Sequence, residues 1–226
     1  MRKKYGIALE VSGKLGMFAR PETGSDGCSY PIPPASACLG IIQSVCRVRG
    51  AEITVVAVGV CSEPRLVPYS LNSNSAIRKQ DTINSGDMCQ KRVTVLENPT
   101  FQILAYVVTD ASKGHERYTH INHAHSLQEQ FNRRLKDGQN FTPVCLGWKE
   151  FIASYVGVPK SPVLKNYHNY IGTFTHGDYH SDSYYQGLDV QPIQNAKISN
   201  GVFCFTNDEV KVDNVLQFAD PAQYNM

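Results

Sequence analysis

The order of hydrophobic and polar positions along the chain predicts three strands. Residues 5–18 alternate between aliphatic and smaller or polar side chains, which is typical of a strand with one buried face and places Glu10 on the exposed face. Residues 51–60 form a continuous run rich in Ile and Val, as buried strands do. Residues 101–109 are rich in β-branched and aromatic side chains, which also favours a strand.

Two segments have the period of an amphipathic helix. One runs from Pro34 to about Arg49, with proline near its first turn. The other spans residues 121–136, repeats apolar side chains every four residues, and is closed by Gly138. The order strand, helix, strand, insertion, strand, helix predicts an α+β fold of the ferredoxin-like type, which RNA-recognition modules reuse.

A long polar excursion interrupts this order between residues 64 and 88 and is flanked by basic pairs. Excursions of this length in a compact domain are usually functional or mobile. Beyond Gly147 the chain is rich in aromatic, glycine and proline residues, which predicts short strands and loops. We therefore expect a domain at 1–150 with an insertion at about 65–95, and a smaller β-rich region at 151–226.

Composition indicates a globular protein, because 42% of the 226 residues are hydrophobic and 19% are charged. The net charge of +2 is low for a dedicated nucleic-acid binder. However, the basic excess lies in residues 1–95, whereas residues 151–226 are acidic overall. No apolar run is long enough to span a membrane and the first residues do not read as a signal peptide, so a cytoplasmic location without membrane contact is expected.

Cysteine and histidine spacing gives little support for a metal site. The seven cysteines form no CxxC pair, which favours reduced thiols over a zinc ribbon. His120 lies near two further histidines, and His176 and His180 are four residues apart, as zinc ligands on one helix can be. Residues 172–185, however, read as a loop. We expect no metal or other cofactor, and a metal-dependent hydrolase remains an alternative.

Three groups of polar residues are candidates for function. His123 and His125, at the start of the second helix, suit metal-independent RNA cleavage, which needs groups that move a proton from the 2′-hydroxyl and to the 5′-oxygen; the alternative is that they only cap the helix. Arg20, at the exit of the first strand, can grip phosphate or form a surface ion pair with Glu22. Arg133-Arg134, late on the second helix, can reach a ligand or complement the helix C-terminus.

Four motifs in register resemble the CRISPR-associated Cas-five family, and in particular its type I-C branch. They are GMFARPETGSDGCSYPIPPASACLGIIQSV, IRKQDTI, QKRVTVLENPTFQILAYV and FNRRLKDGQNFTPVCLGWKEFIAS. The resemblance covers roughly residues 5–155. It implies a repeat-associated (RAMP-type) ferredoxin-like domain whose excursion is a thumb-like β-hairpin. It also implies a subunit that binds the 5′ handle of crRNA and caps a Cascade complex, in contact with the backbone (Cas-seven type) and large (Cas-eight type) subunits, and with target DNA only through the complex.

The resemblance also implies which residues carry these roles. The RNA-binding set consists of Arg20, Glu22, Arg78, Lys79, Lys91, Arg92, Arg133 and Arg134.

The type I-C branch often cuts precursor crRNA without metal, using an aromatic hydroxyl on the first helix and a Lys-His pair on the second. Here Cys46 stands at the aromatic position, and Ser126 and Leu127 stand at the Lys-His positions. The catalytic candidates are therefore His123, His125 and Cys46, and cleavage stays open. A protein–protein adaptor, docking through the aromatic-rich region after residue 150, is a further alternative.

Overall fold

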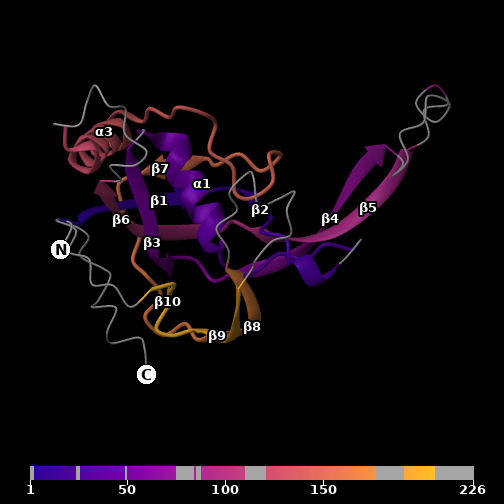
Figure 1. Cartoon of the computed structure of the whole chain (residues 1–226). Coiled ribbons are helices and arrows are strands. Elements are labelled where there is room, and N and C mark those ends of the chain that lie inside the picture. Colours follow the sequence, from indigo (N-terminus) through magenta and orange to yellow (C-terminus); the bar gives the residue numbers. More distant parts are fainter. Residues whose placement is uncertain are drawn as a thin grey trace.

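Three antiparallel sheets and two long helices make up the described part of the chain, a mixed α+β fold (Figure 1). The computed structural model describes residues 3–23, 26–48, 50–74, 84, 88–109, 121–176 and 191–206. In chain order the elements are β1 (Tyr5–Ser12), β2 (Leu15–Gly16), η1 (Pro21–Thr23), α1 (Ala35–Val45), β3 (Ala51–Val60), β4 (Arg65–Asn74), β5 (Met88–Glu97), β6 (Thr100–Thr109), α3 (His123–Asp137), β7 (Tyr155–Gly157), β8 (Asn169–His176), β9 (Gln191–Ile198) and β10 (Val202–Cys204).

The central sheet has the strand order β10-β3-β6-β1-β7, so the three predicted strands lie side by side with β6 in the middle. Leu9 of β1 pairs with Ile103 of β6, which in turn pairs with Val58 of β3. Both helices cover the same face of this sheet (Figure 1). The apolar stripe of α3, including Leu127 and Phe131, packs there against the alternating aliphatic side chains of β1. No described helix is long and apolar enough to cross a membrane.

The second face of β1 is buried too, which corrects the half-exposed strand predicted from alternation. Glu10 is only 1% exposed. Its carboxylate accepts hydrogen bonds from the backbone N–H groups of Lys160 (2.8 Å) and Ser161 (2.7 Å) and from the Ser161 hydroxyl (2.8 Å). The segment that follows β7 therefore covers this face. The buried carboxylate is tolerated because its oxygens have three donors.

Helix α1 ends at Val45, earlier than the predicted end near Arg49. Cys46 already has extended backbone angles (φ −152, ψ 137). The guanidinium of Arg134 on α3 donates a hydrogen bond of 2.7 Å to the carbonyl oxygen of Val45. A cation on the last carbonyls satisfies groups that a helix end leaves without an intrahelical partner and complements its dipole. The end of α1 is thus stabilised by a residue far away in the sequence.

Helix α3 begins and ends close to the predicted positions. Asn122 is its N-cap, and the side-chain oxygen accepts from the backbone N–H of His125 (3.1 Å). Gly138 adopts the left-handed conformation (φ 66) just after the last helical residue. This conformation favours glycine and confirms the terminator predicted from the sequence.

The polar excursion forms a β-hairpin. β4 and β5 pair along their whole length, from Arg65 opposite Glu97 to Asn74 opposite Met88. Figure 1 shows the hairpin projecting sideways from the central sheet. Because hairpin strands satisfy one another's backbone groups, a polar sequence can extend into solvent as a strand pair.

The segment after residue 150 contributes to two sheets. β7 and β10 form the two edges of the central sheet, and β8 pairs with β9. The prediction of a loop over residues 172–185 is wrong for residues 172–176, because Asn169–His176 is a strand, and the rest of that segment lies outside the described residues. Phe174 anchors it, with its ring against Tyr30 at 4.8 Å and Phe203 at 5.1 Å between centroids. The division of the chain at residue 150 stays a prediction.

Candidate functional site

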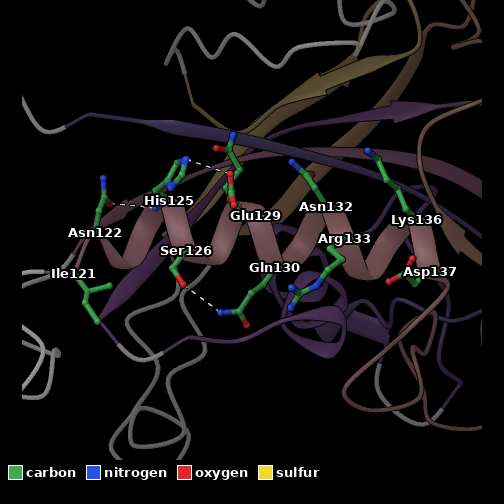
Figure 2. A pocket seen from close by; sticks show the side chains of 11 residues that line it. Ile121, Asn122, His125, Ser126, Glu129, Gln130, Asn132, Arg133, Lys136 and Asp137 are labelled. Carbon is green, nitrogen blue, oxygen red and sulfur yellow. Dashed lines mark hydrogen bonds and ion pairs between the residues drawn. The ribbon is translucent and has the colours of Figure 1, made fainter.

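The exposed face of α3 carries a groove of about 700 Å³. Since the apolar stripe of the helix faces the sheet, the polar side chains of its other faces line this groove. Figure 2 shows all the residues that line the groove, which are Ile121, Asn122, His125, Ser126, Gln128, Glu129, Gln130, Asn132, Arg133, Lys136 and Asp137. The imidazole, the amides and the two cations are groups that contact phosphate and sugar oxygens, and the carboxylates of Glu129 and Asp137 line the same groove.

His125 is held by two neighbours. Its Nε2 lies 3.5 Å from Oε1 of Glu129, one helical turn further on. The edge of the imidazole meets the ring of Tyr5 at the start of β1, with centroids 5.5 Å apart. The Tyr5 hydroxyl accepts a hydrogen bond from the side-chain amide of Asn122. The histidine side chain remains 51% exposed, so its orientation is restricted while it stays accessible to a ligand.

Cys46 lies in a different environment, directly after the end of α1. It is 1% exposed, and its Sγ lies 4.0 Å from Oε1 of Gln130 on α3. The other end of that amide donates to the Ser126 hydroxyl at 3.2 Å. Burial raises the pKa of the Cys46 thiol, and this outweighs the opposite influence of Arg134 and Arg133. A thiol with a raised pKa stays protonated at neutral pH and is a poor proton acceptor.

The structure does not bring the candidate catalytic residues together. His125 and Glu129 extend from one side of α3, whereas Ser126 and Gln130, the partner of Cys46, extend from the other (Figure 2). His123 is half-buried at the first helical position. Residues two apart on a helix do not face each other, so His123 and His125 are not a pair. The catalytic roles of the three residues stay predictions.

Of the two arginines late on α3, only Arg133 is free to meet a ligand. It is exposed and lines the groove together with Lys136. Arg134 is used structurally, through its hydrogen bond to the carbonyl of Val45. Sequence reasoning treated the two as equivalent, because nothing in a pair of adjacent arginines indicates which one faces the neighbouring helix.

In the turn after the first strand, Arg20 contacts both an acidic and an aromatic side chain. Arg20 and Glu22 form an ion pair at 3.9 Å, as the surface interpretation predicts. The guanidinium of Arg20 also lies over the ring of Tyr30, 4.9 Å from its centroid, and its side chain is 26% exposed. Both contacts orient the cation, whose Nε is buried and has no hydrogen-bond partner among the described residues. A role for Arg20 and Glu22 in RNA binding stays a prediction.

The basic residues of the hairpin differ in their placement. Lys91 on β5 points toward Trp148, with Nζ 5.6 Å from the ring centroid, whereas the neighbouring Arg92 is exposed. Arg78 and Lys79 lie outside the described residues. Neighbouring positions of a strand face opposite sides, which explains why the Lys91-Arg92 pair is divided between two surfaces.

The histidine clusters gain no support as a metal centre. Within the described ranges, no group of three or more His, Cys, Asp or Glu side chains is arranged to hold a metal ion. His120, His180 and the side chain of His176 lie outside what the structure describes.

Sequence reasoning missed four residues that the structure places in or beside the grooves or the candidate site residues: Tyr5, Glu129, Lys136 and Trp148. Glu129 and Lys136 could have been found from their spacing of four and eleven residues from His125, which places them on neighbouring faces of one helix. Tyr5 reaches His125 only through the packing of β1 against α3, for which the local sequence carries no signal.

Comparisons with known proteins agree on one family. The model of the family described as "CRISPR-associated protein (Cas_Cas5)" matches residues 6–170. A "CRISPR pre-crRNA endoribonuclease Cas5d" from Mannheimia succiniciproducens is 25% identical over 166 residues, which cover 66% of this chain and 71% of the relative. A protein of the same name from Thermus thermophilus is 28% identical over 155 residues, covering 66% of this chain and 62%, less than two thirds, of the relative.

Solved structures show the same fold. A functionally uncharacterized protein from Streptococcus mutans aligns with a TM-score of 0.66 at 15% identity, over 91% of this chain and 95% of the other. A structure described as a CRISPR-associated protein aligns with a TM-score of 0.66 at 15% identity, over 91% and 94%. These likenesses confirm the mixed α+β fold. Since the family model covers most of the chain, this protein belongs to the Cas5d family of CRISPR-associated proteins.

Proposed function

We propose that this protein binds the 5′ handle of crRNA and caps a type I Cascade surveillance complex in the prokaryotic cytoplasm. The observation that carries the proposal is the polar face of α3, in a chain that matches the Cas5 family model over residues 6–170. Arg133 and Lys136 supply cations there, and Asn132 supplies an amide. Such groups bind phosphate and sugar oxygens and fix the register of an RNA without reading its sequence.

We further infer that the central sheet is a ferredoxin-like RAMP domain with β4–β5 as its thumb-like hairpin. The support is the order β7-β1-β6-β3, with α1 connecting β1 to β3 and α3 connecting β6 to β7. In this arrangement both helices lie on one face. The proposed division places the domain at residues 1–150 and a smaller region at 151–226; the fourth strand of the ferredoxin-like order, β7, comes from the start of that smaller region.

The proposed protein partners are a backbone subunit of the Cas-seven type and a large subunit of the Cas-eight type, with target DNA reached only through the complex. Support for protein contacts comes from large apolar side chains on the surface near β7. Phe141 is 70% exposed, Ile152 61% and Val158 47%. Exposed apolar groups beside a sheet edge are typical of a surface that another protein covers. The adaptor alternative is compatible with this proposal.

Binding can be tested with the purified protein and labelled CRISPR repeat RNA, with and without EDTA, scored for both mobility shift and cleavage. We expect specific binding over a scrambled RNA of the same length. An Arg133→Ala/Lys136→Ala variant should bind more weakly and with a smaller salt slope, because fewer counterions are released. Equal binding of the repeat and the scrambled RNA would contradict recognition of the handle.

A second candidate function, metal-independent cleavage of precursor crRNA, is favoured by the contacts of His125. In the proposed step the imidazole accepts the proton of a ribose 2′-hydroxyl, and that oxygen attacks the adjacent phosphorus. The bond from phosphorus to the 5′-oxygen breaks, and this oxygen takes a proton from an acid. Tyr5 supplies a phenol beside His125, and Asn122 orients its oxygen. This phenol would take the place of the aromatic hydroxyl that Cys46 cannot supply.

A further inference from the structure

A second groove lies where the outer half of the β4–β5 strand pair meets the loop after α3. Its volume is about 540 Å³. Asn72 and Lys91 line it from the hairpin, and Trp148, Lys149 and Glu150 line it from the loop. We call it the tryptophan groove. It combines an aromatic ring with two cations and an amide, in a part of the molecule separate from the groove on α3.

The indole of Trp148 is held in a fixed position. Gly147 has φ +86, and a Cβ there would collide with the carbonyl oxygen of Met17. The backbone N–H of Met17 donates to the Leu146 carbonyl at 2.8 Å, which ties the loop to the strand region. Only glycine allows this close approach of two backbones. The loop therefore presents the following residue from a rigid support.

The ring itself is supported from within the protein. It stacks on Phe151, with centroids 6.3 Å apart and an interplanar angle of 9°. Phe151 is 5% exposed and packs edge-on against Tyr69 of β4, with centroids 5.5 Å apart. Trp148 is only half-buried and borders the open groove. A preorganised aromatic ring loses little conformational entropy when a flat ligand stacks on it.

Charged and polar groups border the ring. Nζ of Lys91 lies 5.6 Å from its centroid, and the exposed Lys149 follows it in the chain. Asn72 offers an amide, and Glu150 offers a carboxylate that can accept from a base amino group. Proteins bind a nucleotide of single-stranded RNA with this combination, an aromatic ring for the base and cations for the phosphate.

We propose that the tryptophan groove binds one nucleotide of single-stranded RNA. Its base stacks on Trp148, and Lys91 and Lys149 contact the flanking phosphates. The proposal rests on the RNA-binding function proposed above and extends it to a site on the β4–β5 hairpin. Because every base has a π-face, the groove accepts any base, and the contact adds affinity more than sequence selectivity.

Trp148 is the only tryptophan in the chain, so its fluorescence reports on this groove directly. The experiment titrates the full-length protein with CRISPR repeat RNA and, separately, with an oligouridylate of the same length. We expect quenching that saturates together with the mobility shift. Trp148→Ala should weaken binding roughly tenfold, whereas Trp148→Phe should retain most of the affinity.

Two further variants control for folding and for charge. Tyr170→Ala removes a ring that is 65% exposed on β8 and does not line the groove, and it should leave affinity and quenching unchanged. Lys91→Ala/Lys149→Ala should raise the Kd and reduce the salt slope, with the same quenching at saturation. This double variant tests the groove even where Trp148→Ala fails to fold.

The outcomes separate the two proposals. RNA binding without a fluorescence change, with normal affinity in Trp148→Ala or in the lysine variant, overturns the groove and leaves the proposed function standing. Quenching by oligouridylate and repeat RNA alike supports the groove and contradicts selective recognition of the handle. Absence of binding to either RNA overturns both proposals. Quenching by a peptide from a Cascade subunit, with none by RNA, assigns the groove to a protein partner and also overturns it as an RNA site.

Discussion

His125 and Ser126 are neighbours in the chain, yet they belong to sides of α3 with different properties. The histidine side contains a half-exposed imidazole, the carboxylate of Glu129 and the phenol of Tyr5. The serine side connects through Gln130 to the buried thiol of Cys46, whose pKa burial raises. The histidine side presents accessible polar groups to the groove, whereas the serine side links the groove to the packing between α1 and α3.

The comparison shows that positions matched by sequence alone differ widely in their exposure to a ligand. The family resemblance directs attention to Cys46, Ser126 and Leu127. Leu127 is fully buried in the core, and Cys46 is nearly so. The exposed imidazole of His125 and carboxylate of Glu129 instead lie one helical face away. Exposure and hydrogen-bond partners therefore decide between residues that are adjacent in the sequence.

The largest expected effect is on cleavage. If the histidine side is the active one, His125→Ala should slow cleavage of labelled repeat RNA by about 100-fold or more, because general base catalysis is lost. Cys46→Ala should cut at close to the normal rate. Single-turnover assays in EDTA measure both variants. The reverse pattern, with a normal rate in His125→Ala and a large loss in Cys46→Ala, would reverse the assignment of the two sides.

A smaller effect is expected on stability, and it distinguishes two adjacent arginines. Arg134→Ala should lower the free energy of unfolding by about 1.5 kcal/mol, because a charged donor to the Val45 carbonyl is lost. Arg133→Ala should change it by less than about 0.5 kcal/mol, since this side chain is exposed. Urea denaturation followed by circular dichroism provides the measurement. An equal loss of unfolding free energy in the two variants would show that the hydrogen bond from Arg134 to the Val45 carbonyl does not stabilise the protein.

RNA affinity should show the opposite order for the same two residues. Arg133→Ala should weaken binding of repeat RNA a few-fold at moderate salt and lower the salt slope by about 0.7, the value for one phosphate contact on a single strand. A Lys136→Ala variant, on the same groove, should behave alike. Filter binding at several salt concentrations tests this. A flat salt dependence in the unmodified protein would exclude phosphate contacts at this surface.

The mildest expected effect concerns thiols and pH. The raised pKa of Cys46 means that alkylation stays slow at neutral pH and accelerates only in alkaline solution. Burial likewise raises the pKa of Cys61 to about 12 and that of Cys204 to about 11. The ordinary pKa of a cysteine thiol is 9.0, so above pH 9 these thiols lose their protons when the protein unfolds. The free energy of unfolding therefore falls as the pH rises from 9 to about 12.

Mass spectrometry of alkylated peptides at several pH values, beside unfolding curves from pH 8 upward, would check the thiol prediction. The half-exposed Cys28 serves as an internal standard. Alkylation of Cys46 at neutral pH as fast as that of Cys28 would show that the serine side is open to solvent.

Much of the fold could be predicted from the sequence because the relevant signals are local. The buried strand at residues 51–60 was predicted with the observed bounds. The end of α3 at Gly138 follows from a left-handed residue that glycine favours. The motif FNRRLKDGQNFTPVCLGWKEFIAS includes Gly147, and the structure gives this glycine a steric reason, the contact with Met17.

The remaining features depend on contacts between distant segments. The early end of α1 depends on Arg134, which is 89 residues away in the chain. The burial of Glu10 depends on Ser161, 151 residues away. At the candidate site, the histidines were predicted from residue type, but the contact of His125 with Tyr5 and the separation from Cys46 depend on how β1, α1 and α3 pack. Periodicity carries no information on such contacts.

The carboxylate of Glu10 has a consequence for local opening of the molecule. The amides of Lys160 and Ser161 lie outside the named strands, where amide hydrogens ordinarily exchange rapidly with solvent. Both donate to a side chain on a buried central strand. Their hydrogens can exchange only when the segment detaches from β1, so they should exchange as slowly as the sheet itself. In Glu10→Gln the same two amides should become the first of this region to exchange.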